Sequence, residues 1–124
     1  MRTYTVGYRK AGHFDHRRDK RLRLPVFSVK VGQERYDSIN WSLGGILVGN
    51  YNGYLFQGMS ILINVQVKAD MRREARDEDG LTIEALVIRH DLEKRELALK
   101  FQRLTPTILD FFERSFNFHN RAAR

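Results

Sequence analysis

The side chains best suited to binding chemistry lie in two clusters, and the first of them is cationic. It reads Arg17-Arg18-Asp19-Lys20-Arg21-Leu22-Arg23, and Arg17 and Arg21 are four residues apart. A guanidinium donates a planar pair of hydrogen bonds to phosphate or to the O6 and N7 edge of guanine, and it also stacks on purine faces. Lysine supplies charge without this fork. The cluster therefore favours an anionic, planar ligand.

The second cluster, Asn40-Trp41-Ser42-Leu43-Gly44-Gly45, has the composition of a polar turn. The Asn40 amide and the Ser42 hydroxyl can hydrogen-bond a ligand. Gly44 and Gly45 are expected to permit positive φ and close approach, so that backbone N–H groups near them can hold an anion. Trp41 is expected to pack in the fold or at its rim, with stacking on a ligand base as the alternative.

A predicted hairpin connects the two clusters. Residues 9–23 show no apolar periodicity, which indicates an irregular arm. The next stretch has the period-two alternation of a half-buried strand, with apolar side chains at Phe27, Val29 and Val31. A tight turn at Gly32-Gln33 then lets residues 34–39 pair back as a second strand. This hairpin delivers Asn40 to the polar turn.

The rest of the chain predicts four more strands and one helix. The strands are expected at 46–48, 54–68, 82–90 and 95–102. Thr105 is expected to cap a terminal helix that starts at Pro106, with one face made by Ile108, Leu109, Phe112, Phe116 and His119. Six short strands with hairpin links and a terminal helix predict a small antiparallel β-barrel, since closure removes exposed edges. A chain of 124 residues that is 42% hydrophobic fits one domain.

The spacing of the two clusters resembles the bipartite signature of PilZ domains, which are bacterial receptors for cyclic di-GMP. The matching residues are Arg17-x-x-x-Arg21 and, after about twenty residues, Asn40-x-Ser42-x-x-Gly45. Many family members carry Asp where this chain has Asn40. The resemblance extends over residues 16–119 and implies an all-β fold, a six-stranded PilZ-type barrel with a closing helix. It implies a cyclic di-GMP site made by Arg17, Arg18, Arg21, Asn40, Ser42, Gly44 and Gly45.

The charge is concentrated near the start of the chain. Residues 1–23 hold eight of the 22 basic residues and two of the 15 acidic ones, so this segment accounts for most of the net charge of +7. We expect a flexible arm at 1–15, the barrel and helix at 16–119 and a tail at 120–124. The hypothesis is an adaptor whose arginine arm becomes ordered on the barrel when cyclic di-GMP binds and then signals to a protein partner.

Two alternatives remain at this stage. The chain could be a ligand-silent PilZ-like module that acts only through protein contacts. It could also be a small nucleic-acid-binding barrel, although its nearly neutral body disfavours a broad electrostatic interface.

Other functions have little support in the sequence. There is no nucleophile elbow, P-loop or pair of matched carboxylates, so we expect a binding module and no enzyme. His13-x-x-His16 beside Asp15 lacks further ligands, and neither a metal nor another cofactor is predicted. No stretch approaches the roughly 20 apolar residues that span a bilayer, and cysteine is absent. Together these features favour a cytoplasmic protein without membrane insertion.

Overall fold

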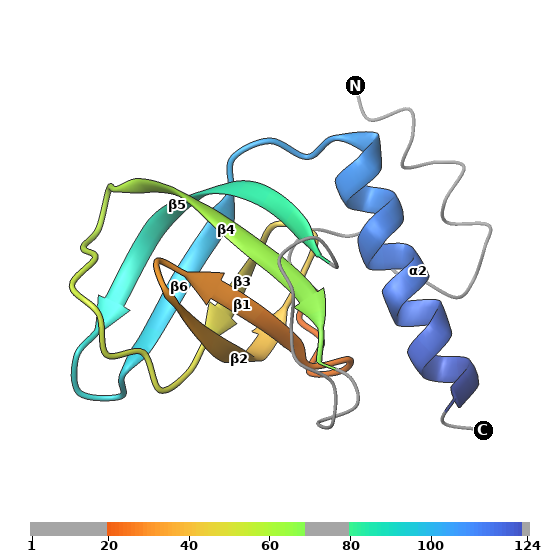
Figure 1. Ribbon diagram of the computed structural model, residues 1–124, viewed down its shortest axis with the longest axis horizontal. Helices are drawn as coiled ribbons and strands as arrows, with labels where there is room; N and C mark the ends of the chain where they lie inside the picture. The colour runs from red at the N-terminus through yellow and green to blue at the C-terminus, as the bar shows by residue number, and fades with distance from the viewer. Residues whose placement is uncertain (1–19, 69–79, 123–124) are drawn as a thin grey trace.

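Six antiparallel strands close into a barrel in the order β1-β2-β3-β6-β5-β4 (Figure 1). The computed structural model describes residues 20–68 and 80–122, and side chains as far as Phe118. The elements are β1 (Phe27–Val31), β2 (Glu34–Trp41), β3 (Gly45–Val48), β4 (Ser60–Val67), β5 (Leu81–Asp91), β6 (Glu96–Phe101) and α2 (Pro106–Ala122). The predicted fold class, an all-β barrel with a terminal helix, is confirmed.

One predicted link is not a hairpin. β3 pairs with β6, and β4 pairs with β1 and β5, so the segment between β3 and β4 crosses from one side of the barrel to the other. Consequently β4 begins at Ser60 and not at Tyr54 as predicted. The residues before it form a loop that contains Gly58 with a φ of 95°. A glycine in this left-handed conformation interrupts a strand, because it cannot continue the extended ladder.

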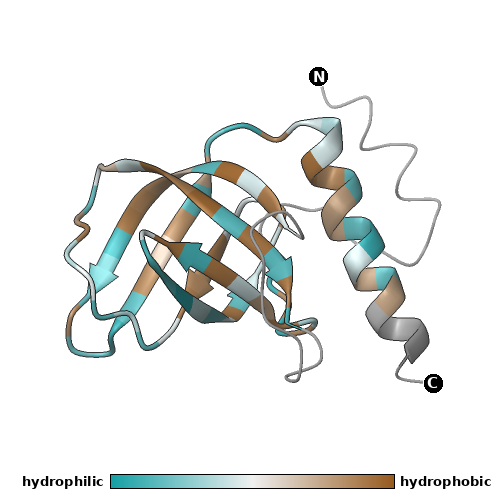
Figure 2. Ribbon diagram, in the orientation of Figure 1, coloured by the Kyte–Doolittle hydropathy of each residue, from teal (hydrophilic) through white to brown (hydrophobic). Residues whose placement is uncertain are grey.

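Apolar and polar residues alternate along the strands, as Figure 2 shows by colour. The inward side chains of β4 include Ile63 and Val65. The opposite face of β4 is also largely covered, because Asn64 and Gln66 are each only 8% exposed. Arg35 donates from Nη2 to Asn64 Oδ1 over 2.8 Å, which places a polar cluster on the outside of the barrel.

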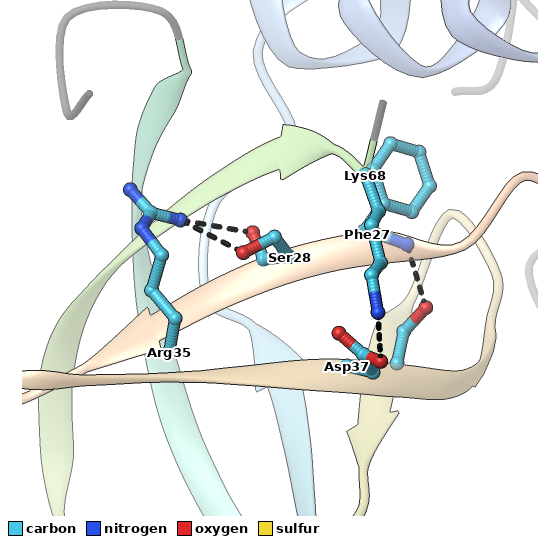
Figure 3. A network of polar contacts seen from close by, with 6 residues as sticks. Phe27, Ser28, Arg35, Asp37 and Lys68 are labelled. Carbon is cyan, nitrogen blue, oxygen red and sulfur yellow. Dashed lines mark hydrogen bonds and ion pairs between the residues drawn. The ribbon is translucent and has the colours of Figure 1, made fainter. Parts of the chain in front are cut away.

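Further polar contacts connect β1, β2 and the residue that follows β4 (Figure 3). Arg35 Nη1 donates to the carbonyl oxygen and the hydroxyl of Ser28 over 3.3 and 3.2 Å. Lys68 Nζ lies 2.6 Å from Asp37 Oδ2, and the Phe27 N–H donates to Ser38 Oγ over 2.8 Å. The Arg35 and Phe27 contacts join β1 to β2. The Lys68–Asp37 ion pair joins this hairpin to the residue that follows β4.

α2 covers the end of the barrel where β1 begins and β2 and β6 end (Figure 1). Thr105 Oγ1 accepts a hydrogen bond from the Ile108 N–H over 3.2 Å, as expected for the predicted cap. The helix buries Ile108, Leu109 and Phe112 as predicted, and it also packs Phe111 on Phe27.

α2 continues to Ala122, beyond the boundary expected after residue 119, since no Gly or Pro interrupts it. The expected arm at 1–15 lies outside the described residues, as does the side chain of His119. The domain boundaries therefore stay predictions. No helix in the described part of the chain is long and apolar enough to cross a membrane.

Candidate functional site

A two-residue β-bridge positions the described end of the arginine cluster. The Leu22 N–H donates to the Trp41 carbonyl over 2.7 Å, and the Trp41 N–H donates to the Leu22 carbonyl over 2.8 Å. Neighbouring residues along an extended chain point to opposite faces, so Arg21 faces the same side as Asn40 and Ser42 while Trp41 faces the core. The bridge thus brings the two sequence clusters together.

The guanidinium of Arg21 is bound by both residues of the polar turn that the sequence singled out. Nε and Nη2 donate to Asn40 Oδ1 over 2.8 and 2.5 Å, and Nη1 donates to Ser42 Oγ over 3.0 Å. A longer contact of 3.4 Å joins Nη2 to the Asn40 carbonyl. Partial burial of the guanidinium lowers the pKa of Arg21, but an arginine stays protonated at neutral pH. The site therefore holds a fixed positive charge.

The turn itself differs from the prediction. Among the described glycines only Gly32 and Gly58 have a positive φ, so Gly44 and Gly45 do not supply the left-handed backbone that was expected. Their N–H groups are also engaged: the Gly44 N–H donates to Ser42 Oγ over 3.1 Å, and the Gly45 N–H donates to the Ser42 carbonyl over 3.4 Å. The N–H groups that were expected to hold an anion are thus hydrogen-bonded within the turn in this arrangement.

The predicted close approach does occur at Gly45. A Cβ on this residue would collide with the carbonyl oxygen of Leu99 on β6. Ser42 is only 2% exposed and accepts hydrogen bonds from both Arg21 and the Gly44 N–H. In this arrangement Ser42 orients the arginine and closes the turn.

Trp41 belongs to the core, so the stacking alternative is wrong for this arrangement. It is fully buried, and its ring stacks on Phe112 of α2 with centroids 5.2 Å apart. Its Nε1 donates to the Pro25 carbonyl over 3.1 Å. The strand alternation that turns Asn40 and Ser42 outward also turns Trp41 inward.

Beside Arg21 a groove of about 600 Å³ runs along the outer wall of the barrel. This volume is within the range of small-molecule sites. Its walls come from the arm, the polar turn, β3, β5 and β6, and it is lined by Arg21, Asn40, Ser42, Gly44, Gly45, Ile46, Leu47, Ile88, Arg89, Ala98, Leu99 and Lys100. Arg21 and the four predicted turn residues therefore share one surface. Arg17 and Arg18 lie outside the described residues.

The groove also contains residues that were not predicted as site residues. Arg89 and Lys100 add two cations, while Leu47 and Ala98 add an apolar surface. Each of these residues belongs to a strand for which the sequence predicted only the alternation of apolar and polar side chains. No local motif marks these residues, because their meeting depends on which strands pair and in what register.

Comparison with known proteins finds the same fold in several solved structures, one of them a PilZ domain. The PilZ domain of Escherichia coli YcgR with c-di-GMP matches at 18% identity and a TM-score of 0.55, over 87% of this chain and 95% of that one. YcgR of the same organism in complex with c-di-GMP matches at 19% identity and 0.58, over 88% and 48%. The Bacillus subtilis inhibitor of motility, MotI/DgrA, matches at 18% identity and 0.56, over 87% and 53%.

The chain thus spans about half the length of MotI/DgrA and of the longer YcgR structure. No family model and no curated protein sequence matches it. At these identities the likeness concerns the fold: the chain has the six-stranded barrel and closing helix seen in PilZ-type structures.

Proposed function

We propose that this chain is a receptor and adaptor domain for cyclic di-GMP. The observation that carries the proposal is the meeting of Arg21 with Asn40 and Ser42 at the edge of a groove of ligand size. Arg21 lies about twenty positions before Asn40 and Ser42 in the sequence. An arginine with a purely structural role would not need a groove of ligand size beside it. The fold of the YcgR PilZ domain with c-di-GMP supports the same ligand class.

The contacts leave suitable donors for a guanine or a phosphate. Asn40 Oδ1 is occupied by Arg21, and no acceptor in the described ranges takes the Asn40 NH₂ group. That amide can donate to the O6 or N7 of a guanine. Arg21 Nη1 has a second N–H beyond the one it gives to Ser42, and it can donate to a phosphate oxygen.

The arm completes the proposed receptor. A chain rises at most about 3.5 Å per residue, so Arg17 and Arg18 are within about 14 Å of Arg21 and can reach the groove. Their guanidiniums would hold the phosphates or stack on a guanine, and the ordered arm would become a new surface for a protein partner. In this proposal the protein binds its ligand and catalyses no reaction.

One observation favours the ligand-silent alternative. Three nitrogens of Arg21 already have protein partners, so a purely structural contact would look the same. A titration of the wild type with cyclic di-GMP, linear pGpG and a single-stranded oligonucleotide separates the alternatives. We expect tight binding of cyclic di-GMP and much weaker binding of pGpG.

The other outcomes assign the chain differently. Heat from none of these ligands would favour the ligand-silent module. Oligonucleotide binding that strengthens with length and weakens steeply with salt would favour the nucleic-acid-binding barrel. In the same experiment, unchanged backbone amide signals for residues 1–23 at saturating cyclic di-GMP would contradict the ordering of the arm.

A further inference from the structure

Four residues form one continuous row across the floor and ends of the groove. The strand register pairs Asn40 of β2 with Leu47 of β3, Leu47 with Ala98 of β6, and Ala98 with Arg89 of β5. Directly opposed residues in antiparallel strands point to the same face, which here is the outer face that lines the groove. The row therefore has a polar residue at each end and apolar side chains between them.

Both ends of the row depend on a register shift. β2 is irregular between Ser38 and Asn40, and β5 is irregular between Val87 and Arg89. With regular pairing Ile39 would oppose Leu47, and Ile88 would oppose Ala98. The shifts place Asn40 and Arg89 there instead.

The two isoleucines that the pairing passes over are poorly buried: Ile39 is 37% exposed, and Ile88, which also lines the groove, is 40% exposed. Leaving two isoleucines partly exposed carries an energetic penalty. Bulges next to binding sites commonly re-aim a side chain toward the site. A register shift occurs at both ends of the row. This indicates that the two end residues, Asn40 and Arg89, have a role in the groove.

The geometry suits a ligand with two separated anionic groups. Neighbouring strands are about 4.8 Å apart, so Asn40 and Arg89 are about 14 Å apart along the curved wall. Arg21 lies on Asn40 at one end, and Arg89 is the cation at the other. Lys100, paired with Gly45 in the next row, adds charge near the middle.

We propose that Arg89 is a ligand-binding residue and the second anion anchor of the groove. Arg21 and Arg89 would each pair with one phosphate of a cyclic dinucleotide, and a purine would lie over Leu47 and Ala98. This inference rests on the proposed function and adds a residue that selects for two phosphates over one. A mononucleotide has a single phosphate and engages one arginine at a time, so it gains little from the second anchor.

The test is a calorimetric titration of cyclic di-GMP and of GMP into the wild type and Arg89→Gln. Arg103→Gln is the matched control, because Arg103 is exposed and does not line the groove. We expect Arg89→Gln to weaken cyclic di-GMP binding by about tenfold or more, as for loss of a charge-assisted contact. GMP binding by that variant and cyclic di-GMP binding by Arg103→Gln should stay within about twofold of the wild type.

Arg89→Lys keeps the positive charge but removes the planar guanidinium with its paired donors. We expect its affinity for cyclic di-GMP to lie between those of Arg89→Gln and the wild type. Cyclic di-GMP binding that is lost in Arg21→Ala but unchanged in Arg89→Gln would overturn the second anchor and leave the proposed function intact. Equal weakening by Arg89→Gln and Arg103→Gln would also overturn it, since net charge would then be the cause. Absence of binding to the wild type would overturn the proposed function together with this inference.

Discussion

Arg21 donates through both Nε and Nη2 to the single side-chain oxygen of Asn40, which lies nineteen positions later in the chain. The Leu22–Trp41 bridge makes this contact possible, because it fixes the arm beside the end of β2. The same bridge directs Trp41 into the core, where it stacks on Phe112. The candidate site is therefore connected to the packing of α2 through one residue pair.

Arg21→Lys should weaken cyclic di-GMP binding by about tenfold or more, although the charge is kept. An ammonium cannot contact Asn40 and Ser42 in the planar geometry of the guanidinium. Calorimetric titration measures the change, with Arg103→Lys as the control on an exposed arginine outside the groove. Full affinity in Arg21→Lys would show that only the charge matters.

Gly45→Ala should destabilise the barrel by about 1–3 kcal/mol, because the added methyl group meets the Leu99 carbonyl and separates β3 from β6. Gly49→Ala is the control, since its methyl group meets only the exposed side chain of Ile39, and we expect a change within about 0.5 kcal/mol. Urea unfolding measures both. Equal stability of the two variants would contradict the close approach.

Phe112→Ala should destabilise the protein by about 3–5 kcal/mol, because it opens a cavity between Trp41, Phe27 and Phe101. Phe118→Ala is the matched control, as this phenylalanine is exposed on the same helix. Trp41 is the only tryptophan, so its fluorescence reports the change directly. A red-shifted emission is expected in Phe112→Ala alone, and identical unfolding curves for the two variants would contradict the packing.

Stability should fall at high pH partly through Tyr36. Burial raises the pKa of Tyr36, with smaller contributions from the negative charges of Tyr51 and Glu34. Because folding favours the neutral phenol, this contribution is complete below the ordinary tyrosine pKa of about 10 and is lost as pH rises through the raised value. Urea unfolding between about pH 8 and 11.5 should show a shallower decline in Tyr36→Phe than in the wild type.

The exposed Tyr54 provides the comparison for that experiment. Tyr54→Phe should decline with pH as the wild type does. If Tyr36→Phe and Tyr54→Phe declined equally, Tyr36 would not be the group whose titration destabilises the fold.

The sequence was sufficient for the features that depend on local pattern. Period-two alternation predicted the β1–β2 hairpin, and Thr105 before Pro106 predicted the start of α2, because both signals lie within a few residues. The alternation pattern placed the start of β4 too early. The strand begins at Ser60, and a loop occupies the positions predicted as its first residues. Apolar residues in that loop follow a pattern typical of a strand, but the loop does not form one.

The site was predictable in part for the same reason. Arg21, Asn40, Ser42, Gly44 and Gly45 carried a recognisable spacing, and they line one groove. Arg89 carried no signal, because its position opposite Ala98 follows from a register shift that only the paired strands define. Trp41 was expected to pack in the fold or at its rim, and it lies in the core. Its partner there, Phe112, carried no signal near Trp41, because that contact depends on a helix far along the chain.

The central claim is that Arg21, Asn40 and Ser42 form part of a cyclic di-GMP site. Calorimetric titration of cyclic di-GMP into the wild type and Arg21→Ala tests it most directly, with linear pGpG as the second ligand. We predict tight binding of cyclic di-GMP to the wild type, at least about a hundredfold loss in Arg21→Ala and much weaker binding of pGpG. No heat from the wild type, or equal affinity in Arg21→Ala, would contradict the claim and leave the barrel without this ligand.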